Sequence, residues 1–300
     1  MRDILIIGSG PAGLSAAVYA KRAGLDALVV EKEFMGTGQI AESSRVDNYI
    51  GLVGKSGYEL GELFRGDAEK LGAEFLEEEV VSLSQKNYIW VSQFADGGSI
   101  EAKAVIYAAG ASHRKLNVAG EEKFIGKGVS FCAMCDGAFY REKTVAVIGG
   151  GDTAVDDALY LADIADKVYL IHRRGEFRAA AGTVKKAEEK PNIEFVLSAN
   201  VTEILGENHV EKITLDNGRE LAVDGVFIAV GMIPRTDILK GIVETDEHGY
   251  VVADESGVTS ARGLFVAGDV RTKKLRQVIT AAADGANASV SAIEYLKFEV

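Results

Sequence analysis

The chain has 300 residues, of which 47% are hydrophobic and 26% are charged, and its formal net charge is −12. This length and hydrophobic content allow about two domains with full cores. The acidic balance argues against a nucleic-acid-binding protein, which would present a basic face, and against binding to an anionic membrane surface.

The N-terminal segment 1–8 contains an apolar run that is too short for a signal peptide. No stretch of the chain approaches the ~18 apolar residues of a membrane-spanning helix. We therefore expect a cytoplasmic protein without a membrane partner. Because disulfides are rarely structural in such a reducing compartment, the two cysteines of the chain are more plausibly catalytic.

The first predicted unit begins with a buried parallel strand over residues 3–8, which runs into a G-x-G-x-x-G motif. An alanine-rich helix follows as far as about Ala23, and a second strand over 27–30 ends at Glu31. Glycines let the backbone approach a pyrophosphate at a helix N-terminus, and the second strand ends where an acid holds ribose hydroxyls. This order predicts a dinucleotide site formed by Gly8, Gly10, Pro11, Ala12, Gly13 and Glu31.

The chain then continues through loops, a helix and a set of strands. Residues 36–39 and 47–51 are polar and turn-like, and we interpret them as surface connections unless a ligand binds them. Residues 56–72 show the apolar periodicity of a helix, and the alternating pattern over 73–108 predicts strands.

The only two cysteines of the chain occur in the segment Cys132-Ala133-Met134-Cys135-Asp136-Gly137. Two thiols at this spacing can close a disulfide across one tight turn, or act as a redox pair with a lowered thiol pKa. The acid directly after the second cysteine supplies a proton donor within reach of a thiolate. We therefore interpret Cys132, Cys135 and Asp136 as catalytic residues.

Two other roles are open to the cysteine pair. A zinc site needs about four ligands, but the chain has no second C-x-x-C and its four histidines are scattered along the sequence. A buried structural pair without chemistry is the other alternative, although isolated cysteines at redox spacing rarely arise as filler. The pattern favours redox chemistry and no metal.

The strand–turn–helix pattern recurs between residues 145 and 172. The segment Gly149–Ala154 matches the first motif when Gly149 is aligned with Gly8, and alanine in the last position still permits close helix–strand packing. A strand over 167–171 ends at His172, 18 residues after the motif, as Glu31 does in the first unit. The repeat predicts a second dinucleotide site formed by Gly149, Gly151, Asp152, Thr153 and Ala154.

The two predicted sites differ at the end of their second strand. A carboxylate there favours a free ribose 2′-hydroxyl and repels a 2′-phosphate, whereas arginines can form paired hydrogen bonds with a phosphate. The first unit should therefore bind a dinucleotide without a 2′-phosphate. The second should bind NADPH through His172, Arg173, Arg174 and Arg178. The alternative is that these arginines belong to a solvated charged loop without a ligand.

The rest of the chain completes both units. We expect strands over 192–230, a loop over 231–236 and a polar linker over 237–249. The C-terminal piece contains a strand that ends in Gly-Asp near 263–269, and then a long alanine-rich helix from about Arg276. With a matching linker near 111–117, the second unit would be inserted into the first.

These motifs, in this order, resemble the low-molecular-weight, bacterial-type NADPH-dependent thioredoxin reductases. The resemblance covers essentially the whole chain and implies an α/β fold with two Rossmann-like domains of the three-layer ββα type. An NADPH-binding domain of residues 113–245, which carries the C-x-x-C, would be inserted into a discontinuous FAD-binding domain of residues 1–112 and 246–300. The resemblance also implies a homodimer.

The resemblance further implies a role for individual residues. The FAD pyrophosphate would lie at the first glycine motif with Glu31 on the adenosine ribose. Cys135 would be the flavin-proximal thiol, Cys132 the thiol that attacks the protein substrate, and Asp136 the general acid and base. Four residues would complete the flavin site: Gln39 and Asn48 near the flavin, Asp269 on the ribityl chain, and Gln277 over the isoalloxazine ring.

Four positions depart from the family pattern. The departures are Thr37 beside the usual glycine pair, Ile50 and Ala119 where proline is usual, and Met134 where threonine is common. None of them removes a chemical group, so they bear on partner choice and loop geometry rather than on the reaction.

The prediction is a flavoprotein disulfide reductase that passes electrons from NADPH through FAD and the Cys132–Cys135 pair to a thioredoxin. The same chemistry could serve a glutaredoxin-like protein or a peroxiredoxin. A small-molecule dithiol oxidase that uses oxygen is a further alternative, although it would be expected to lack the arginines. A non-catalytic nucleotide-sensing module would leave Cys132, Cys135 and Asp136 unexplained.

Overall fold

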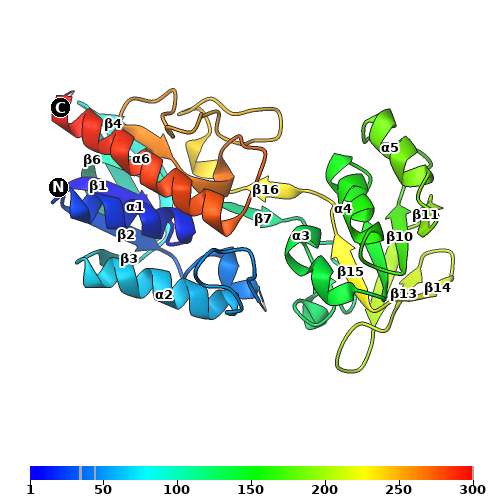
Figure 1. Ribbon diagram of the computed structural model, residues 1–300. Helices are drawn as coiled ribbons and strands as arrows, with labels where there is room; N and C mark the ends of the chain where they lie inside the picture. The colour runs from blue at the N-terminus through cyan, green and yellow to red at the C-terminus, as the bar shows by residue number, and fades with distance from the viewer. Residues whose placement is uncertain (34–35, 44, 299–300) are drawn as a thin grey trace. The chain divides into compact units, whose positions relative to one another are not determined.

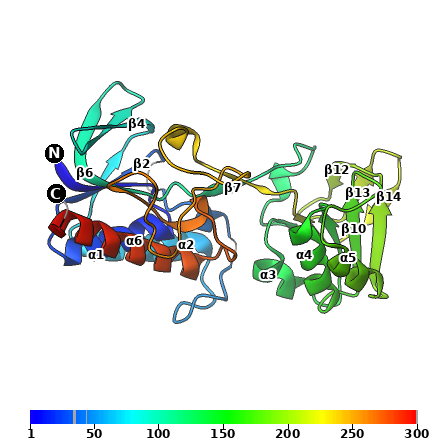
Figure 2. The same cartoon turned by 90° about the horizontal axis from the view of Figure 1, so that it is seen from above.

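The computed structural model describes residues 1–33, 36–43 and 45–298 (Figures 1 and 2). Contacts divide the chain into two compact units. The first unit consists of Met1–Ser112 together with Ile233–Val300, and the second consists of His113–Met232. The second unit is therefore a continuous insertion between the two pieces of the first.

Among its described residues, the first unit contains a seven-stranded mixed sheet and three α-helices. Its strands are β1 (Arg2–Ile7), β2 (Ala27–Glu31), β3 (Glu74–Glu77), β4 (Val80–Lys86), β5 (Ile89–Phe94), β6 (Ser99–Tyr107) and β17 (Leu264–Val266). Its helices are α1 (Pro11–Arg22), α2 (Gly57–Lys70) and α6 (Val278–Phe298), with the short 3₁₀ turns η1 (Gln39–Glu42), η4 (Asp237–Leu239) and η5 (Gly268–Val270).

The sheet of the first unit has the strand order β3-β2-β1-β6-β5-β4, and β17 joins it beside β6. The strands β3, β2, β1, β6 and β17 run parallel, whereas β4 and β5 form an antiparallel hairpin that continues along the first part of β6. The parallel strands end at a common edge, so the loops after β1, β2, β6 and β17 are neighbours in space.

Alternate residues of a strand point to opposite faces of a sheet, and in the central strands β1, β2 and the second half of β6 the residues on both faces are buried. In β1, Ile4 and Ile6 face the cluster beneath α1 and α6, whereas Leu5 and Ile7 face a second cluster that includes Trp90 of β5. A strand that is covered on both faces has a continuous run of apolar residues in its sequence. Such runs occupy residues 4–7 of β1 and 104–107 of β6.

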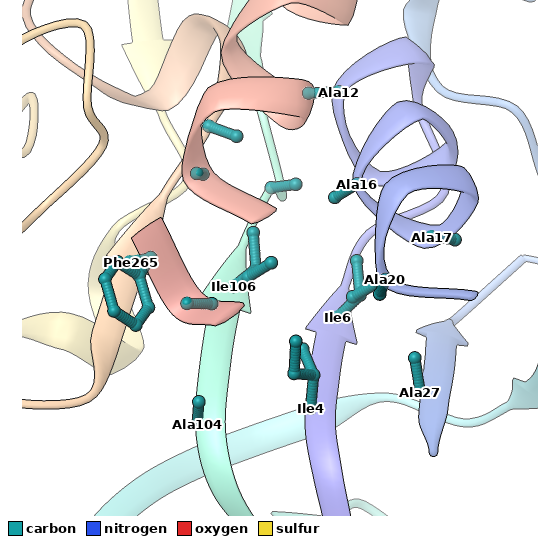
Figure 3. Packing of buried hydrophobic residues seen from close by; sticks show 14 of the residues in the cluster. Ile4, Ile6, Ala12, Ala16, Ala17, Ala20, Ala27, Ala104, Ile106 and Phe265 are labelled. Carbon is teal, nitrogen blue, oxygen red and sulfur yellow. The ribbon is translucent and has the colours of Figure 1, made fainter. Parts of the chain in front are cut away.

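Helices α1 and α6, from opposite ends of the chain, lie side by side on the sheet (Figures 1 and 2). Figure 3 shows the small side chains of Ala12, Ala16 and Ala20 on the face of α1 that meets α6 and the strands. A Cβ placed on Gly285 of α6 would lie 1.9 Å from the Ala12 carbonyl oxygen, so only glycine fits at this contact. Small residues thus let the two backbones touch, and this joins the two pieces of the unit.

The second unit repeats the plan with a smaller sheet. Its strands are β8 (Val129–Ser130), β9 (Thr144–Ile148), β10 (Lys167–His172), β11 (Ile193–Leu197), β12 (Val201–Leu205), β13 (Lys212–Leu215), β14 (Glu220–Ala222) and β15 (Gly225–Ile228). Its helices are α3 (Ala133–Asp136), α4 (Asp152–Ala162) and α5 (Ala181–Glu188), with the 3₁₀ turns η2 (Glu122–Phe124) and η3 (Gly137–Tyr140).

Three layers make up the second unit. A five-stranded sheet of order β11-β10-β9-β15-β8 is parallel throughout, and β12, β13 and β14 form a separate antiparallel sheet. Val145 and Val147 of β9 pack with residues of α3 and α4, whereas Ala146 and Ile148 pack with residues of the antiparallel sheet. The result is a helical layer, a parallel sheet and an antiparallel sheet, which confirms the three-layer fold that the family resemblance implies.

Most elements lie where the sequence predicts them, and two segments differ. The 231–236 segment is not simply a loop, since β16 (Met232–Pro234) pairs with β7 (Ala111–His113) in a two-stranded sheet. The polar 237–249 segment belongs to the first unit, and its Leu239 is buried in the core of that unit. The boundary between the two units lies between Met232 and Ile233. The pattern misleads here because apolar residues in a short 3₁₀ turn show no periodicity.

Within the described parts of the chain, no helix combines the length and the apolar character needed to cross a bilayer.

We predict that Gly285→Ala destabilises the protein by about 3 kcal/mol, because the new Cβ would force α1 and α6 apart. Urea unfolding followed by circular dichroism would measure the loss. The matched control is Gly66→Ala in α2, where a Cβ would meet nothing within 4 Å. That change should stabilise the helix by up to about 1 kcal/mol, and equal effects of the two substitutions would contradict the close-contact argument.

Candidate redox and dinucleotide-binding sites

The first glycine motif forms a tight turn between β1 and α1. Gly8 has a φ of +103°, and a Cβ there would lie 2.5 Å from the Ala108 carbonyl oxygen. A Cβ on Gly13 would lie 1.8 Å from the Gly8 carbonyl oxygen, whereas one on Gly10 would meet nothing closer than 3.8 Å. Gly8 and Gly13 are therefore fixed by packing of the turn. Gly10 leaves open space, which fits a site where a pyrophosphate approaches the backbone.

Glu31, at the end of β2, is bound to this turn. Its Oε2 accepts a hydrogen bond of 2.9 Å from the Ser9 amide and lies 2.9 Å from the Ser9 hydroxyl, which is closer, at 2.5 Å, to the Gly36 carbonyl oxygen. Its Oε1 accepts from the amides of Lys32 and Glu33 at 2.9 and 3.3 Å. The carboxylate thus lies beside the glycine turn in a fixed orientation, and a ribose hydroxyl bound here would share it with Ser9.

Asp269 lies in η5, directly after β17. Its Oδ1 is buried and has no hydrogen-bond partner within the described residues. Burial raises the pKa of this carboxyl, and the nearby Lys273 and Arg276 oppose the rise. A buried acceptor without a partner is the kind of group that a ligand hydroxyl satisfies, so Asp269 fits a polyhydroxyl chain such as the ribityl group of FAD.

A buried ion cluster, which the sequence analysis missed, holds the η5 turn. Asp284 of α6 accepts from the Gly268 amide at 3.0 Å and forms a two-pronged pair with Arg271, at 2.7 and 3.0 Å. Lys273 Nζ lies 2.7 Å from the same carboxylate. Asp284 and Arg271 are each only 6% exposed. No sequence signal links these residues, because the pairing arises only when α6 packs beside η5.

Two further predicted flavin residues lie together although 229 positions separate them. The Asn48 side-chain amide donates to Gln277 Oε1 at 2.9 Å, which brings the 47–51 loop to the start of α6. Gln39 is the first residue of η1, after the close contact of Gly38 with Gly10. All the predicted FAD residues therefore belong to the first unit.

The second glycine motif repeats the geometry of the first. A Cβ on Gly149 would lie 2.3 Å from the Ala229 carbonyl oxygen, whereas one on Gly151 would meet nothing within 4 Å. Ala154, in the first turn of α4, is fully buried, and Thr153 beside it is exposed. Asp152 Oδ1 accepts from the Ala180 amide at 2.8 Å, which fixes the loop that follows β10.

His172, predicted to bind NADPH, is buried at the end of β10, and its Nε2 has no hydrogen-bond partner among the described residues. It is 6% exposed and stacks on Phe177, with ring centroids 5.5 Å apart. Its ring occupies the space that a Cβ on Gly150 would need. Burial and the neighbouring arginines, Arg178 foremost, lower the pKa of His172.

Arg173, Arg174 and Arg178 are all exposed. Across residues 1–33, 36–43 and 45–298, none of the three forms a salt bridge. The Arg178 amide donates to the Gly150 carbonyl oxygen at 2.7 Å, which holds this basic loop against the glycine turn. In a protein with a net charge of −12, three guanidinium groups beside a dinucleotide motif fit an anionic ligand.

Cys132 and Cys135 form a disulfide across the single turn α3. The Cys135 amide donates to Cys132 Sγ at 3.1 Å. Both cysteines are partly buried, and Met134 between them is 59% exposed. The pair follows β8, and the Gly149–Gly151 turn follows β9. Because β8, β15 and β9 are parallel, both segments lie at the C-terminal end of the sheet. No group of three or more His, Cys, Asp or Glu side chains in the described chain could hold a metal ion.

Asp136 ends α3, next to Cys135. Burial raises the pKa of the Asp136 carboxyl, and the hydrogen bond from the Ser130 hydroxyl, at 2.6 Å, opposes the rise. A carboxyl whose pKa is raised keeps its proton to a higher pH than an exposed aspartate does, which suits a group that transfers protons. The three residues predicted to be catalytic are thus adjacent, and Ser130 is a fourth polar group that sequence reasoning missed.

Comparison with known proteins gives a consistent result. Residues 2–285 match the family model described as "Pyridine nucleotide-disulphide oxidoreductase". The thioredoxin reductase of Helicobacter pylori is 43% identical, with 99% of each chain covered, and that of Listeria innocua is 40% identical over 98% of this chain and 94% of its own. The crystal structure of thioredoxin reductase from Streptococcus pyogenes has a TM-score of 0.94 and 39% identity, covering 99% of this chain and 98% of its own.

Asp157 of α4 offers a pH-dependent test of the second unit. Burial, with a smaller contribution from Asp156, raises the pKa of Asp157 to about 7. Between about pH 4 and pH 7 the folded protein therefore holds a proton that the unfolded chain has lost, so the free energy of unfolding falls as the pH rises.

We predict that Asp157→Asn removes this fall and makes the protein about 2 kcal/mol more stable than the wild type at pH 8. Urea unfolding at several pH values would measure it. The exposed Asp166 provides the control, since Asp166→Asn should keep the wild-type slope. An unchanged slope in Asp157→Asn would contradict the assignment.

Proposed function

The chain belongs to the pyridine nucleotide-disulphide oxidoreductases and, among them, to the thioredoxin reductases, and we propose how its residues divide the reaction. The second unit would bind NADPH and carry the redox pair, and the first unit would bind FAD. FAD, when bound, would supply two-electron chemistry that accepts hydride from NADPH and reduces the disulfide. The final acceptor is the disulfide of a thioredoxin.

The observation that carries this proposal is the position of the Cys132–Cys135 disulfide. It follows the edge strand of a dinucleotide-binding sheet, and a partly buried carboxyl lies next to it. The pair therefore belongs to the unit with the exposed arginines. A structural cross-link would need neither the carboxyl nor the dinucleotide motif.

The cysteines have different roles in the proposal. The hydrogen bond from the Cys135 amide to Cys132 Sγ would stabilise a Cys132 thiolate once the disulfide is reduced. Cys132 would attack the thioredoxin disulfide and form a mixed disulfide, which Cys135 then resolves. Asp136 would accept the proton of the Cys135 thiol and donate it to the departing thiolate.

The dinucleotide-binding residues also divide between the two units. Gly8, Gly10 and Gly13 with Glu31 would hold the pyrophosphate and adenosine ribose of FAD. The unpaired Oδ1 of Asp269 supports a contact with the ribityl hydroxyls. In the second unit, the Gly149–Ala154 turn and three exposed arginines would hold NADPH, and His172 would support that loop by packing.

The partner and cellular setting follow the same line. The partner would be a thioredoxin, because the relatives of this chain are thioredoxin reductases. The exposed Met134 beside the cysteines is a position that would contact this partner and influence its selection. We also propose a homodimer in the cytoplasm, where disulfides are rarely structural and a cysteine pair of this kind is usually catalytic.

The first test is an anaerobic titration with NADPH. We predict a yellow protein whose flavin absorbance bleaches on titration, in the wild type and in Cys135→Ser alike, because NADPH reaches the flavin without the cysteines. Reduction of thioredoxin, or of a chromogenic aromatic disulfide, should fall at least about 1,000-fold in Cys135→Ser. A colourless protein that cannot take up FAD, or no bleaching in Cys135→Ser, would contradict the proposed relay.

The arginines give a second prediction. Replacing Arg173, Arg174 and Arg178 by alanine should lower kcat/KM for NADPH about 100-fold, since charge-assisted hydrogen bonds to the 2′-phosphate are lost. The value for NADH should stay within about threefold. Arg219, which pairs with Glu194 at 2.7 Å, supplies the control, because Arg219→Ala should change neither value. Equal losses with NADPH and NADH would argue against phosphate recognition.

A further inference from the structure

Ser130 stands at a fixed point beside the redox pair. It is the last residue of β8 and is aligned with Phe227 of β15 in the parallel sheet. It is 6% exposed. Because β8 is held in the sheet by its pairing with β15, the Ser130 side chain projects from a defined position beside the segment that carries the cysteines.

The Ser130 hydroxyl contacts two parts of the site at once. It donates to Asp136 Oδ2 at 2.6 Å, and it accepts from the Cys132 amide at 3.1 Å. The Cys132 carbonyl oxygen lies farther away, at 3.4 Å. A hydroxyl has a single hydrogen to donate, and the shorter distance assigns that hydrogen to the carboxyl.

We propose that Ser130 is a positioning residue that holds the Asp136 carboxyl and the Cys132 backbone in one arrangement and favours the ionised carboxylate. The inference rests on the proposed function, in which Asp136 transfers the protons of thiol–disulfide exchange. Neither cysteine spacing nor the dinucleotide motifs point to this residue, and it has no chemistry of its own in the reaction.

The proton bookkeeping shows why such a residue matters. The Cys132 thiolate attacks one sulfur of the substrate disulfide, the substrate S–S bond breaks, and the departing thiolate takes a proton from the Asp136 carboxylic acid. Asp136, now a carboxylate, removes the proton of the Cys135 thiol. The Cys135 thiolate attacks Cys132 Sγ, the mixed disulfide breaks, and the second substrate thiolate takes that proton. Asp136 must therefore be able to exist in both forms.

The surroundings of Asp136 push it toward the protonated form, which makes the Ser130 bond significant. Burial disfavours the charged carboxylate. The titratable neighbour in the disulfide form is Tyr140 of η3, whose own pKa is raised first by burial and then by Asp136 and Asp224. The two cysteines join it only when the disulfide is reduced. No cation contributes to the charge balance of Asp136 within the described residues. The donated hydrogen bond is therefore the contact that favours ionisation.

A purely structural role would differ in its electrostatic consequence. A serine that only satisfied the Cys132 amide would leave the titration of Asp136 unchanged when removed. A serine that acts on the carboxyl would change it, because losing a charge-assisted hydrogen bond disfavours the ionised form.

The test is an infrared titration of the Asp136 carboxyl in the oxidised protein, where the cysteines do not titrate. Asp136→Asn identifies the band by removing it. We expect the pKa of Asp136 to rise by about one unit in Ser130→Ala, and to return toward the wild-type value in Ser130→Thr, which keeps a hydroxyl. Ser92, a fully buried serine of β5 whose hydroxyl has no partner among the described residues, supplies the control variant Ser92→Ala.

Kinetics provide the second measurement. In Ser130→Ala, the alkaline limb of the pH profile for thioredoxin reduction should move up by the same amount, because the reduced protein begins the reaction with a protonated Asp136, and the rate at a pH on that limb should rise about tenfold. The rate of flavin bleaching by NADPH tests the proposed function separately. If the wild-type protein shows no bleaching, the proposed function is wrong, whereas the role of Ser130 is judged from the Asp136 titration alone. Identical Asp136 pKa values in wild type, Ser130→Ala and Ser130→Thr would overturn the inference, and circular dichroism would verify that each variant is folded.

Discussion

The contact between α1 and α6 is the constraint on which the first unit depends. Gly285 lies so close to the Ala12 carbonyl oxygen that the two helices pack backbone against backbone. This contact joins the N-terminal and C-terminal pieces into one unit. It also places Asp284, one residue before that glycine, where its carboxylate holds the Gly268 amide. Packing of two helices thus sets the position of the turn that presents Asp269.

The second unit uses the same strand–turn–helix plan with a different addition. Its edge strand β8 leads directly into the cysteine turn, so the disulfide and the second glycine turn share one end of a parallel sheet. A dinucleotide fold whose loops occupy that end can gain new chemistry without changes to its core. Ser130 lies at the junction, as the last residue of the strand and a hydrogen-bond partner of Asp136.

The sequence analysis predicts the elements that repeat or alternate and misses contacts that arise only in three dimensions. Local patterns can be recognised in a single sequence. They include the two glycine motifs, the apolar runs of β1 and β9, and the cysteine pair. The pairing of Arg271 with Asp284, the bond from Asn48 to Gln277 and the bond from Ser130 to Asp136 depend on how separate elements pack. Residue spacing carries no information about such contacts. The polar composition of 237–249 predicts a linker, whereas Leu239 of this segment is buried in the first unit.

The discontinuous first unit has a consequence for the order in which the protein is made. Domains generally fold as units during synthesis, beginning with the segments that leave the ribosome first. The inserted unit is continuous from His113 to Met232, so it can close around its cysteines while the C-terminal piece is still being translated. The alanine face of α1 has no helical partner until α6 emerges at the very end. The nascent chain therefore carries a complete second unit and an incomplete first unit, and the alanine face of α1 stays without its partner helix during that interval.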